Sequence, residues 1–285
     1  MKPFFGIDLT NDKHNKQHNG TAFLCATPSP AMAQALAQAT KKTEAATQAS
    51  RLPLALRIIQ GFCGFVGALF AIGLIRGLRD VTVPEAYSNA PWIFWIGGSM
   101  LLVWGILTLL AKQKQKSVLS SDESARAFSN LESICGSVYR ELGVTESTPQ
   151  TDILGFFYKT KNGQISLCTQ GTQMAPYLNS VFHVFTDSEN LYLVDLDGKY
   201  AIPLSELTRI HTIRKTASFV GWHKKQMINE GIYKQYKLTT DKYNRIHCKY
   251  YHILELKHNG QTWGIHFPCY ELPLFEKLTG LQAQK

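Results

Sequence analysis

Two apolar stretches decide the fold: IIQGFCGFVGALFAIGLI, residues Ile58–Ile75, and PWIFWIGGSMLLVWGILTLLA, residues Pro91–Ala111. Neither contains Asp, Glu, Lys, Arg or His. As helices rising about 1.5 Å per residue they would span roughly 27 and 31 Å, against a bilayer hydrocarbon core of about 30 Å. Buried helices of a soluble protein are the alternative, but such helices seldom lack a polar stripe over this length. The sequence therefore predicts two transmembrane helices and excludes a simple soluble enzyme.

Basic residues flank the pair on one side. They are Lys41, Lys42, Arg51, Arg57, Lys112, Lys114 and Lys116. The connection between the stretches carries only Arg76 and Arg79. Because positive charge is retained in the cytosol, we expect a multi-pass protein of the plasma membrane with both termini cytosolic. Residues 53–78 and 91–111 are then the spans, residues 79–90 form a short external loop, and Trp92 and Trp95 lie at the outer interface.

Small residues recur along both spans, and they permit close approach of two helices. The expected helix-packing residues are Gly64, Gly67, Ala68, Ala71, Gly97, Gly98 and Gly105. We expect the spans to pack on each other as a hairpin, the alternative being a dimer face through Gly73 and Gly77. Ion pathways usually need ionisable groups inside the membrane, so the pair is expected to be an anchor rather than a pore.

The segments beside the spans have their own signals. Residues 1–28 are polar, with strand-like Phe4–Thr10 and Thr21–Ala26 around an Asn-Gly turn signal, which predicts a β-hairpin that docks on the cytosolic domain or stays mobile. Residues 29–52 are Ala-rich and predict a juxtamembrane helix starting at Ser29. Residues 117–143 have apolar positions at helical spacing and predict an amphipathic helix ending at Gly143.

Residues 151–285 change to the period of strands. The expected strands are Ile153–Tyr158, Gln164–Cys168, Val181–Thr186, Asn190–Asp195, Lys199–Ile202, Leu207–Ile213, Tyr233–Leu238, Ile246–Lys257 and Thr262–Phe267. Tyr270–Leu278 predicts a closing helix before Gly280. The expected fold is therefore an α+β membrane protein, in which a two-helix transmembrane hairpin carries a cytosolic, antiparallel, β-barrel-like domain with a C-terminal helix.

Two quoted stretches carry a resemblance to a known family. VFHVFTDSENLYLVDLDGKYAIPLSELTRIHTI (Val181–Ile213) reads as strand, turn, strand, turn, short strand, and a polar step into the next strand. TWGIHFPCYELPLFEKLTGL (Thr262–Leu281) reads as a last strand and capping helix. This order resembles the pleckstrin-homology-like (PH-like) domains of bacterial two-span membrane proteins. The resemblance implies a bent, partly open β-barrel that binds lipids or peptides, and it implies no reaction.

The chain shows no motif of catalysis or cofactor binding. It lacks G-x-S-x-G, H-E-x-x-H, P-loop and G-x-G-x-x-G patterns, and its six cysteines form no C-x-x-C pair. His247 and His252 are five apart and therefore fall on opposite faces of a strand, which does not favour a metal site. We expect no catalytic residue, no metal, no cofactor, and reduced, mostly buried thiols.

Positive charge is the strongest functional signal in a chain with a formal net charge of +9. Between Arg209 and Lys257 there are eleven Lys and Arg residues against three acids, with five tyrosines interleaved. The candidate lipid- or partner-binding residues are Lys224, Lys225, Lys234, Lys237, Lys242, Arg245 and Lys249. They suit anionic lipid head groups; an ordinary solvated face and an acidic protein partner are the alternatives, and membrane tethering makes nucleic acid an unfavourable partner.

The expected function is a membrane-anchored, non-enzymatic binding or regulatory module. The alternative is an accessory subunit of a larger, transporter-like membrane complex, or a homo-oligomer, with the spans and the N-terminal hairpin as contact surfaces. A third hypothesis is an enzyme whose site leaves no sequence signature.

Overall fold

The computed structural model describes residues 6–8, 17–18, 23–77, 82–83, 87–88, 90–154, 156–161, 164–169, 181–214, 216–219, 231, 233–240 and 246–284. The chain divides into two compact units. Ala33–Ile134 form a helical unit, and Met1–Met32 together with Cys135–Lys285 form a sheet unit. The helical unit is thus an insertion into the chain of the sheet unit, and the divisions fall inside two helices, α1 (Pro30–Ala49) and α5 (Asp122–Glu141).

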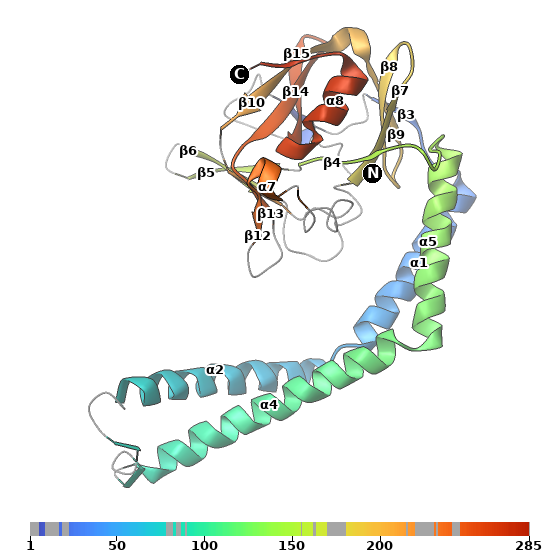
Figure 1. Ribbon diagram of the computed structural model, residues 1–285. Helices are drawn as coiled ribbons and strands as arrows, with labels where there is room; N and C mark the ends of the chain where they lie inside the picture. Colours follow the sequence, from blue (N-terminus) through green and yellow to red (C-terminus); the bar gives the residue numbers. More distant parts are fainter. Residues whose placement is uncertain are drawn as a thin grey trace. The chain divides into compact units, whose positions relative to one another are not determined.

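In the helical unit, α2 (Leu54–Gly77) and α4 (Pro91–Leu119) run antiparallel, side by side (Figure 1). Both are long and apolar enough to cross a membrane. Proline begins α4, where its missing N–H costs no hydrogen bond. The helix continues past the apolar stretch through the lysine-rich segment to Leu119. Ser120 and Ser121 separate α4 from α5, and the Ser121 hydroxyl accepts a 3.3 Å hydrogen bond from the Ser124 N–H.

In the part of the chain that the structure describes, the sheet unit contains two main sheets and two small ones (Figure 1). The six-stranded sheet has the order β16 (Ala283–Gln284), β10 (Leu207–Ile213), β14 (Tyr251–His258), β15 (Gln261–Pro268), β1 (Gly6–Asp8), β2 (Gln17–His18). The five-stranded sheet has the order β3 (Leu24–Ala26), β9 (Lys199–Pro203), β8 (Asn190–Val194), β7 (Val181–Thr186), β4 (Gln150–Asp152). The small sheets are β11 (Ala217–Phe219), β13 (Ile246–Cys248), β12 (Thr239–Thr240), and the pair β5 (Phe156–Lys161) and β6 (Gln164–Thr169).

Local turn chemistry sets the register of the strands. Asn259 and Gly260 join β14 to β15 with φ values of 48° and 76°, the left-handed pair that a tight hairpin requires. The Asp187 carboxylate accepts hydrogen bonds from the N–H groups of Glu189 (2.8 Å) and Asn190 (2.7 Å), which closes the turn between β7 and β8. These backbone bonds, with the Tyr192 hydroxyl, lower the pKa of Asp187. Asp195 closes the next turn in the same way. Asp187 and Asp195 are therefore turn residues.

One core joins the two main sheets and the C-terminal helix α8 (Leu272–Thr279). Phe275 of α8 is fully buried and stacks on Phe267 of β15, with ring centroids 4.1 Å apart. Phe182 and Tyr200 bring the five-stranded sheet into the same cluster. Figure 1 shows α8 beside β14 and β15. The helix ends at Gly280, whose φ of 72° and N–H bond to the Glu276 carbonyl make a left-handed cap.

The structure corrects three expectations about the sheet unit. The described sheets do not close into a barrel, because they are separate and each has two open edges; a 3-10 turn, Leu204–Glu206, carries the chain from β9 to β10 in the other sheet. The expected strand at Tyr233–Leu238 is wrong. Tyr233–Tyr236 form the short helix α7, which lets the Tyr236 ring pack edge-on against Tyr270 at 6.5 Å, and Lys237 ends it with a φ of 53°.

The third correction concerns the N-terminal hairpin. Phe4–Thr10 and Thr21–Ala26 were expected to pair with each other, yet β1 pairs with β2 and β15, while β3 pairs with β9 of the other sheet. Phe23, next to β3, is buried in the main core. An isolated two-stranded hairpin is only marginally stable, so the sheet edges and the core offer this segment more stabilisation than self-pairing does. The Asn19-Gly20 turn lies outside the described residues.

We predict that Phe275→Ala destabilises the sheet unit by about 3–5 kcal/mol, because it removes a fully buried ring and leaves a cavity against Phe267. Denaturant unfolding of the full-length protein in detergent, followed by tryptophan fluorescence, measures the change. Phe128→Ala is the control, since Phe128 of α5 is 41% exposed. Equal effects of the two variants would show that α8 does not seal the core.

Candidate functional site

The seam between α2 and α4 is built on glycines that face large side chains. A Cβ added at Gly67 would lie 2.5 Å from Leu101 Cδ2, and one at Gly64 would lie 2.8 Å from the Trp104 ring. A Cβ at Gly97 would overlap the ring of Phe70. Gly64, Gly67 and Gly97 therefore permit a close approach that no larger residue would allow.

Polar and aromatic contacts between the helices complete the seam. Gln60 Nε2 of α2 donates to Thr108 Oγ1 of α4 at 3.0 Å, and Thr108 in turn donates to the Trp104 carbonyl at 2.7 Å. Near the other end of the apolar segments, the rings of Phe70 and Phe94 meet edge to face at 5.7 Å. Lys114 Nζ donates to the Arg51 carbonyl at 3.0 Å, just before α2 begins. The seam thus holds the helices in one register along their length.

Several other small residues face away from the seam. Gly98 and Gly105, like Gly73 and Gly77, have no heavy atom within 4 Å of an added Cβ. Ala68 is exposed, whereas Ala71, four residues after Gly67 and so on the same helix face, is half-buried. Gly73 and Gly77 line a hollow of about 360 Å³ at the end of the pair near the connecting segment. The small residues therefore form two sets, one inside the seam and one on the outer surface.

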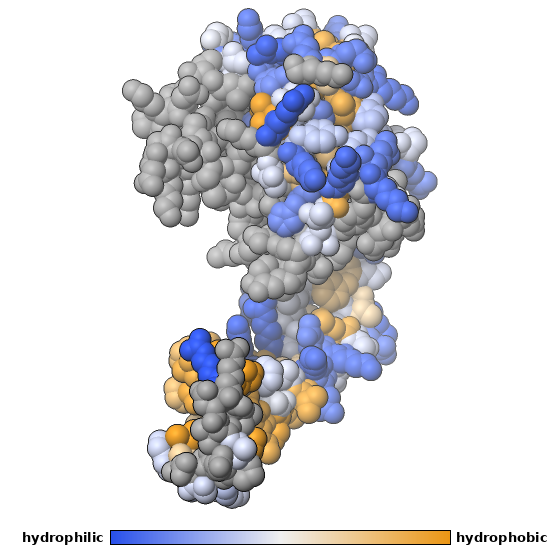
Figure 2. Space-filling model, turned by 60° about the vertical axis from the view of Figure 1, so that its left-hand side comes forward, coloured by the Kyte–Doolittle hydropathy of each residue, from blue (hydrophilic) through white to orange (hydrophobic). Residues whose placement is uncertain are grey.

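The outer surface of the helix pair is covered by large apolar side chains. Those most exposed include Ile58, Phe62, Phe65, Ile75, Trp92, Trp95, Leu102 and Leu109. Figure 2 shows this hydrophobic surface in orange and the mostly hydrophilic surface of the sheet unit in blue. Only 11% of the most apolar window of each helix is buried. A helix in the core of a soluble protein would be mostly buried, so these faces need an apolar environment from outside the described chain.

The predicted basic residues fall partly within the described chain. Lys234 and Lys237 lie on and just after α7, and Lys249 lies between β13 and β14; all three are exposed. Lys224, Lys225, Lys242 and Arg245 lie outside the described residues. Arg209, the first residue of the basic stretch, donates two hydrogen bonds of 2.6 and 3.1 Å to the Glu255 carboxylate.

A second, smaller core lies beneath the three exposed lysines. It contains Leu238, Ile246 and Tyr251, with Tyr236 and Tyr250 packed against it. The thiols of Cys248 and Cys269 are fully buried there, 3.6 Å apart. Their mutual hydrogen bond, followed by burial, raises the pKa of Cys248 far above its ordinary range. The interleaved tyrosines and these thiols therefore support the packing of the loops that carry the lysines.

Sequence reasoning missed a buried polar cluster beside this second core. The Tyr270 hydroxyl donates to Asp152 Oδ2 at 2.6 Å, and the Asp152 N–H donates to Glu271 Oε1 at 3.1 Å. All three residues are buried, and burial, with Asp152 nearby, raises the pKa of Tyr270 well above its usual value. The only sequence signal was an acid inside the apolar run Tyr270–Phe275. The cluster joins β4 to the start of α8.

Two buried histidines lie in β14 and β15. Burial lowers the pKa of His252 to about 4 and that of His266 to about 3, so both are neutral at physiological pH. His252 Nδ1 lies 3.1 Å from the Thr212 hydroxyl, and His266 Nδ1 donates to the Gly264 carbonyl at 3.3 Å. These histidines are core residues of β14 and β15, and the three exposed lysines around the second core lie outside these two strands.

We predict that Gly97→Ala lowers the stability of the helix pair by about 1–3 kcal/mol, because the added methyl group overlaps Phe70. The neighbouring Gly98→Ala is the matched control and should be neutral or stabilising by up to about 1 kcal/mol, since Ala favours helix and the site is open. Thermal melting of the full-length chain in detergent, followed by the helical circular dichroism signal, measures both. An equal loss of stability in the two variants would show that Gly97 does not lie in a close-packed seam.

We also predict that stability falls as the pH drops from about 6.5 towards 4. The unfolded chain binds a proton at each histidine near pH 6.5, whereas folded His252 and His266 resist protonation until about pH 4 and 3. His266 alone contributes a slope of up to about 1.4 kcal/mol per pH unit in this window. His266→Gln should flatten the pH dependence of the free energy of unfolding, measured with denaturant. An unchanged slope would show that other groups cause the pH dependence.

The described residues contain no group of three or more His, Cys, Asp or Glu that could hold a metal ion. The helix-pair surface and the exposed lysines are therefore the candidate functional features. No known protein family, no curated protein and no solved structure matches this chain.

Proposed function

We propose that this protein is a membrane-anchored, non-enzymatic binding or regulatory module. The helices α2 and α4 span the membrane as a hairpin, and the sheet unit lies in the cytosol. The observation that carries the proposal is the apolar outer surface of the helix pair, which lacks Asp, Glu, Lys, Arg and His from Ile58 to Ile75 and from Pro91 to Ala111. Lipid tails supply the environment that this surface needs.

The ends of the helices support an orientation. Trp92 and Trp95 are exposed at the start of α4, where amphipathic rings favour the membrane–water interface. Lys112 and Lys116 are exposed at its other end, and Arg51 and Arg57 flank the start of α2. Since basic residues remain in the cytosol, this end is the cytosolic one and both termini are cytosolic.

The sheet unit supports a role in binding. The sequence pattern of Val181–Ile213 and Thr262–Leu281 resembles PH-like domains, and such domains bind lipids or peptides. Lys234, Lys237 and Lys249 are exposed around the second core, where anionic head groups of the cytosolic leaflet, or an acidic partner, would be attracted by about 1 kcal/mol per nearby lysine.

A second function, an accessory subunit of a larger membrane complex, is favoured by a different observation. Gly98 and Gly105 open onto the outer surface, and Gly73 and Gly77 line the hollow at the connecting-segment end of the pair. A further transmembrane helix could approach closely at these positions. Gly98→Leu should then leave the melting temperature of the chain unchanged and remove a partner from detergent pull-downs. Retention of every partner would reject this second function.

Membrane insertion is tested by alkaline carbonate extraction of membranes that contain the full-length protein. An integral protein stays in the pellet, and release into the supernatant would overturn the proposal. A chain in which Phe65, Leu69, Leu102 and Leu109 are replaced by Ser is the control that should be released, because it loses apolar surface on both helices.

Lysine labelling tests the basic surface. In nanodiscs with anionic lipid, Lys234, Lys237 and Lys249 should be acetylated more slowly than in neutral nanodiscs, and 0.5 M salt should remove the difference. Lys257 is the internal control, because it is exposed near the opposite end of β14 from Lys249. Equal labelling rates in both lipids would show that these lysines do not face the membrane.

A further inference from the structure

The lysines near the C-terminal end of α4 differ in their surroundings. Lys114 lies in the seam and is bonded to the Arg51 carbonyl. Lys112 and Lys116, one turn apart on another face, are exposed, and neither has a hydrogen bond or ion pair through its side chain with any described residue. One lysine thus holds the helix pair together, and two are available to a ligand.

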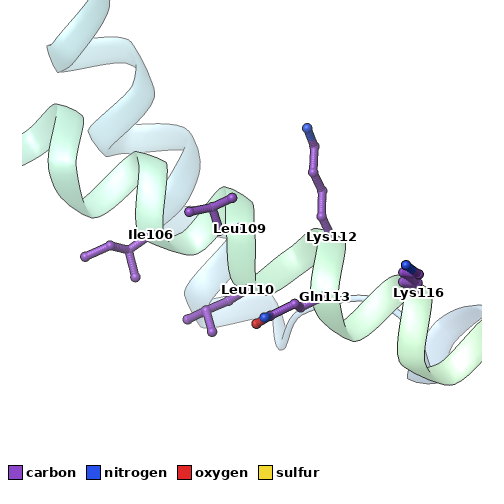
Figure 3. Close-up of a pocket in the computed structure, with 6 residues that line it drawn as sticks. All are labelled: Ile106, Leu109, Leu110, Lys112, Gln113 and Lys116. Carbon is purple, nitrogen blue, oxygen red and sulfur yellow. The ribbon is translucent and has the colours of Figure 1, made fainter.

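These two lysines border a hollow whose remaining wall is apolar except for Gln113. The hollow has a volume of about 460 Å³ and is lined by Ile106, Leu109, Leu110, Gln113 and the two lysines. A second hollow of about 430 Å³ adjoins it and shares Lys112 and Lys116. Figure 3 shows Ile106, Leu109 and Leu110 on the turns of α4 that precede those bearing Lys112 and Lys116.

The spacing matches an amphipathic ligand. Leu109, Lys112 and Lys116 are three and four residues apart and so share one face of α4, with Ile106 and Leu110 on the adjoining face. From Ile106 to Lys116 the helix rises about 15 Å. Along this rise the surface changes from fully apolar to cationic, as an acyl chain changes to a phosphate head group.

The end of the helix does not neutralise these lysines. Lysines near a helix C-terminus often interact with the free carbonyl groups. Here the carbonyl of Lys116 accepts hydrogen bonds from the Ser120 hydroxyl (2.7 Å) and N–H (3.0 Å), and that of Val118 accepts from the Ser121 hydroxyl (2.7 Å). The serines satisfy these carbonyls and leave the ammonium groups for an external anion.

We propose that this face of α4 is a binding site for one anionic phospholipid, whose phosphate lies between Lys112 and Lys116 and whose acyl chain lies along Ile106, Leu109 and Leu110. The charge selects an anionic head group over a zwitterionic one, and the apolar wall selects a lipid over a free phosphate. The inference rests on the proposed membrane insertion, but it uses a different surface from the lysines of the sheet unit.

The test is native mass spectrometry of the full-length protein in a neutral detergent, titrated with phosphatidylglycerol or phosphatidylcholine. The wild-type chain should bind phosphatidylglycerol more tightly than phosphatidylcholine. The double variant Lys112→Gln, Lys116→Gln should weaken phosphatidylglycerol binding about 30-fold, the equivalent of about 1 kcal/mol for each lysine. Lys112→Arg, Lys116→Arg should retain it.

The matched control is Lys41→Gln, Lys42→Gln, which removes two exposed lysines of α1 that lie outside both hollows. Equal phosphatidylglycerol affinity of the control and the Lys112, Lys116 variant would overturn the proposal, as would equal affinity of the wild type for the two lipids. Glycerol phosphate should not compete, and effective competition would overturn the role of the apolar wall. Carbonate extraction of the same chains separates failure of this site from failure of membrane insertion.

Discussion

The apolar outer surface of α2 and α4 is the constraint on which the rest of the structure depends. Where such a surface is excluded from water, each polar group on the helices needs an internal partner. The polar side chains within the two apolar stretches meet this condition: Gln60 bonds to Thr108, Thr108 to the Trp104 carbonyl, and Ser99 to the Ile96 carbonyl at 2.9 Å. The glycine seam helps to satisfy Gln60, because close packing of the helices brings Thr108 within hydrogen-bonding distance of it.

The seam also explains why the two helices form one body. A helix pair in lipid gains little from burying apolar surface, since lipid tails are equally apolar. In lipid, packing at Gly64, Gly67 and Gly97 and the polar contacts toward the basic end of the pair would therefore supply the association. Gly98, next in sequence to Gly97, does not contact the other helix. Composition alone therefore does not tell glycines in the seam from glycines on the outer surface.

Local patterns predicted much of the fold. The strands at Val181–Thr186 and Leu207–Ile213 are observed with the expected bounds, and the helix near Tyr270–Leu278 is also present, because alternation and caps act within a few residues. The errors at Tyr233–Leu238 and at the N-terminal hairpin arose where contacts distant in sequence decide the outcome.

The candidate site was less predictable than the fold for the same reason. The sequence indicates that lysines are numerous, but which ones remain unbonded depends on partners far along the chain. Lys114 is bonded to the carbonyl of Arg51, 63 residues away, and Arg209 is bonded to Glu255, 46 residues away. The buried contact of Asp152 with Tyr270 spans 118 residues and leaves almost no local signal.

The contact between Ser29 and Glu141 has a consequence for biogenesis. The Ser29 N–H and hydroxyl donate to the Glu141 carboxylate at 2.8 and 3.3 Å, so the two ends of the helical insertion meet within the sheet unit. The N-terminal strands β1 and β3 emerge from the ribosome first, yet their partners β15 and β9 are synthesised only after the helices. While both apolar helices are made, β1 can therefore pair only with β2 and β3 still lacks its partner β9, and the sheets are completed last. The same adjacency means that a short turn joining Ser29 to Glu141 would join the two parts of the sheet unit in a chain without the apolar helices.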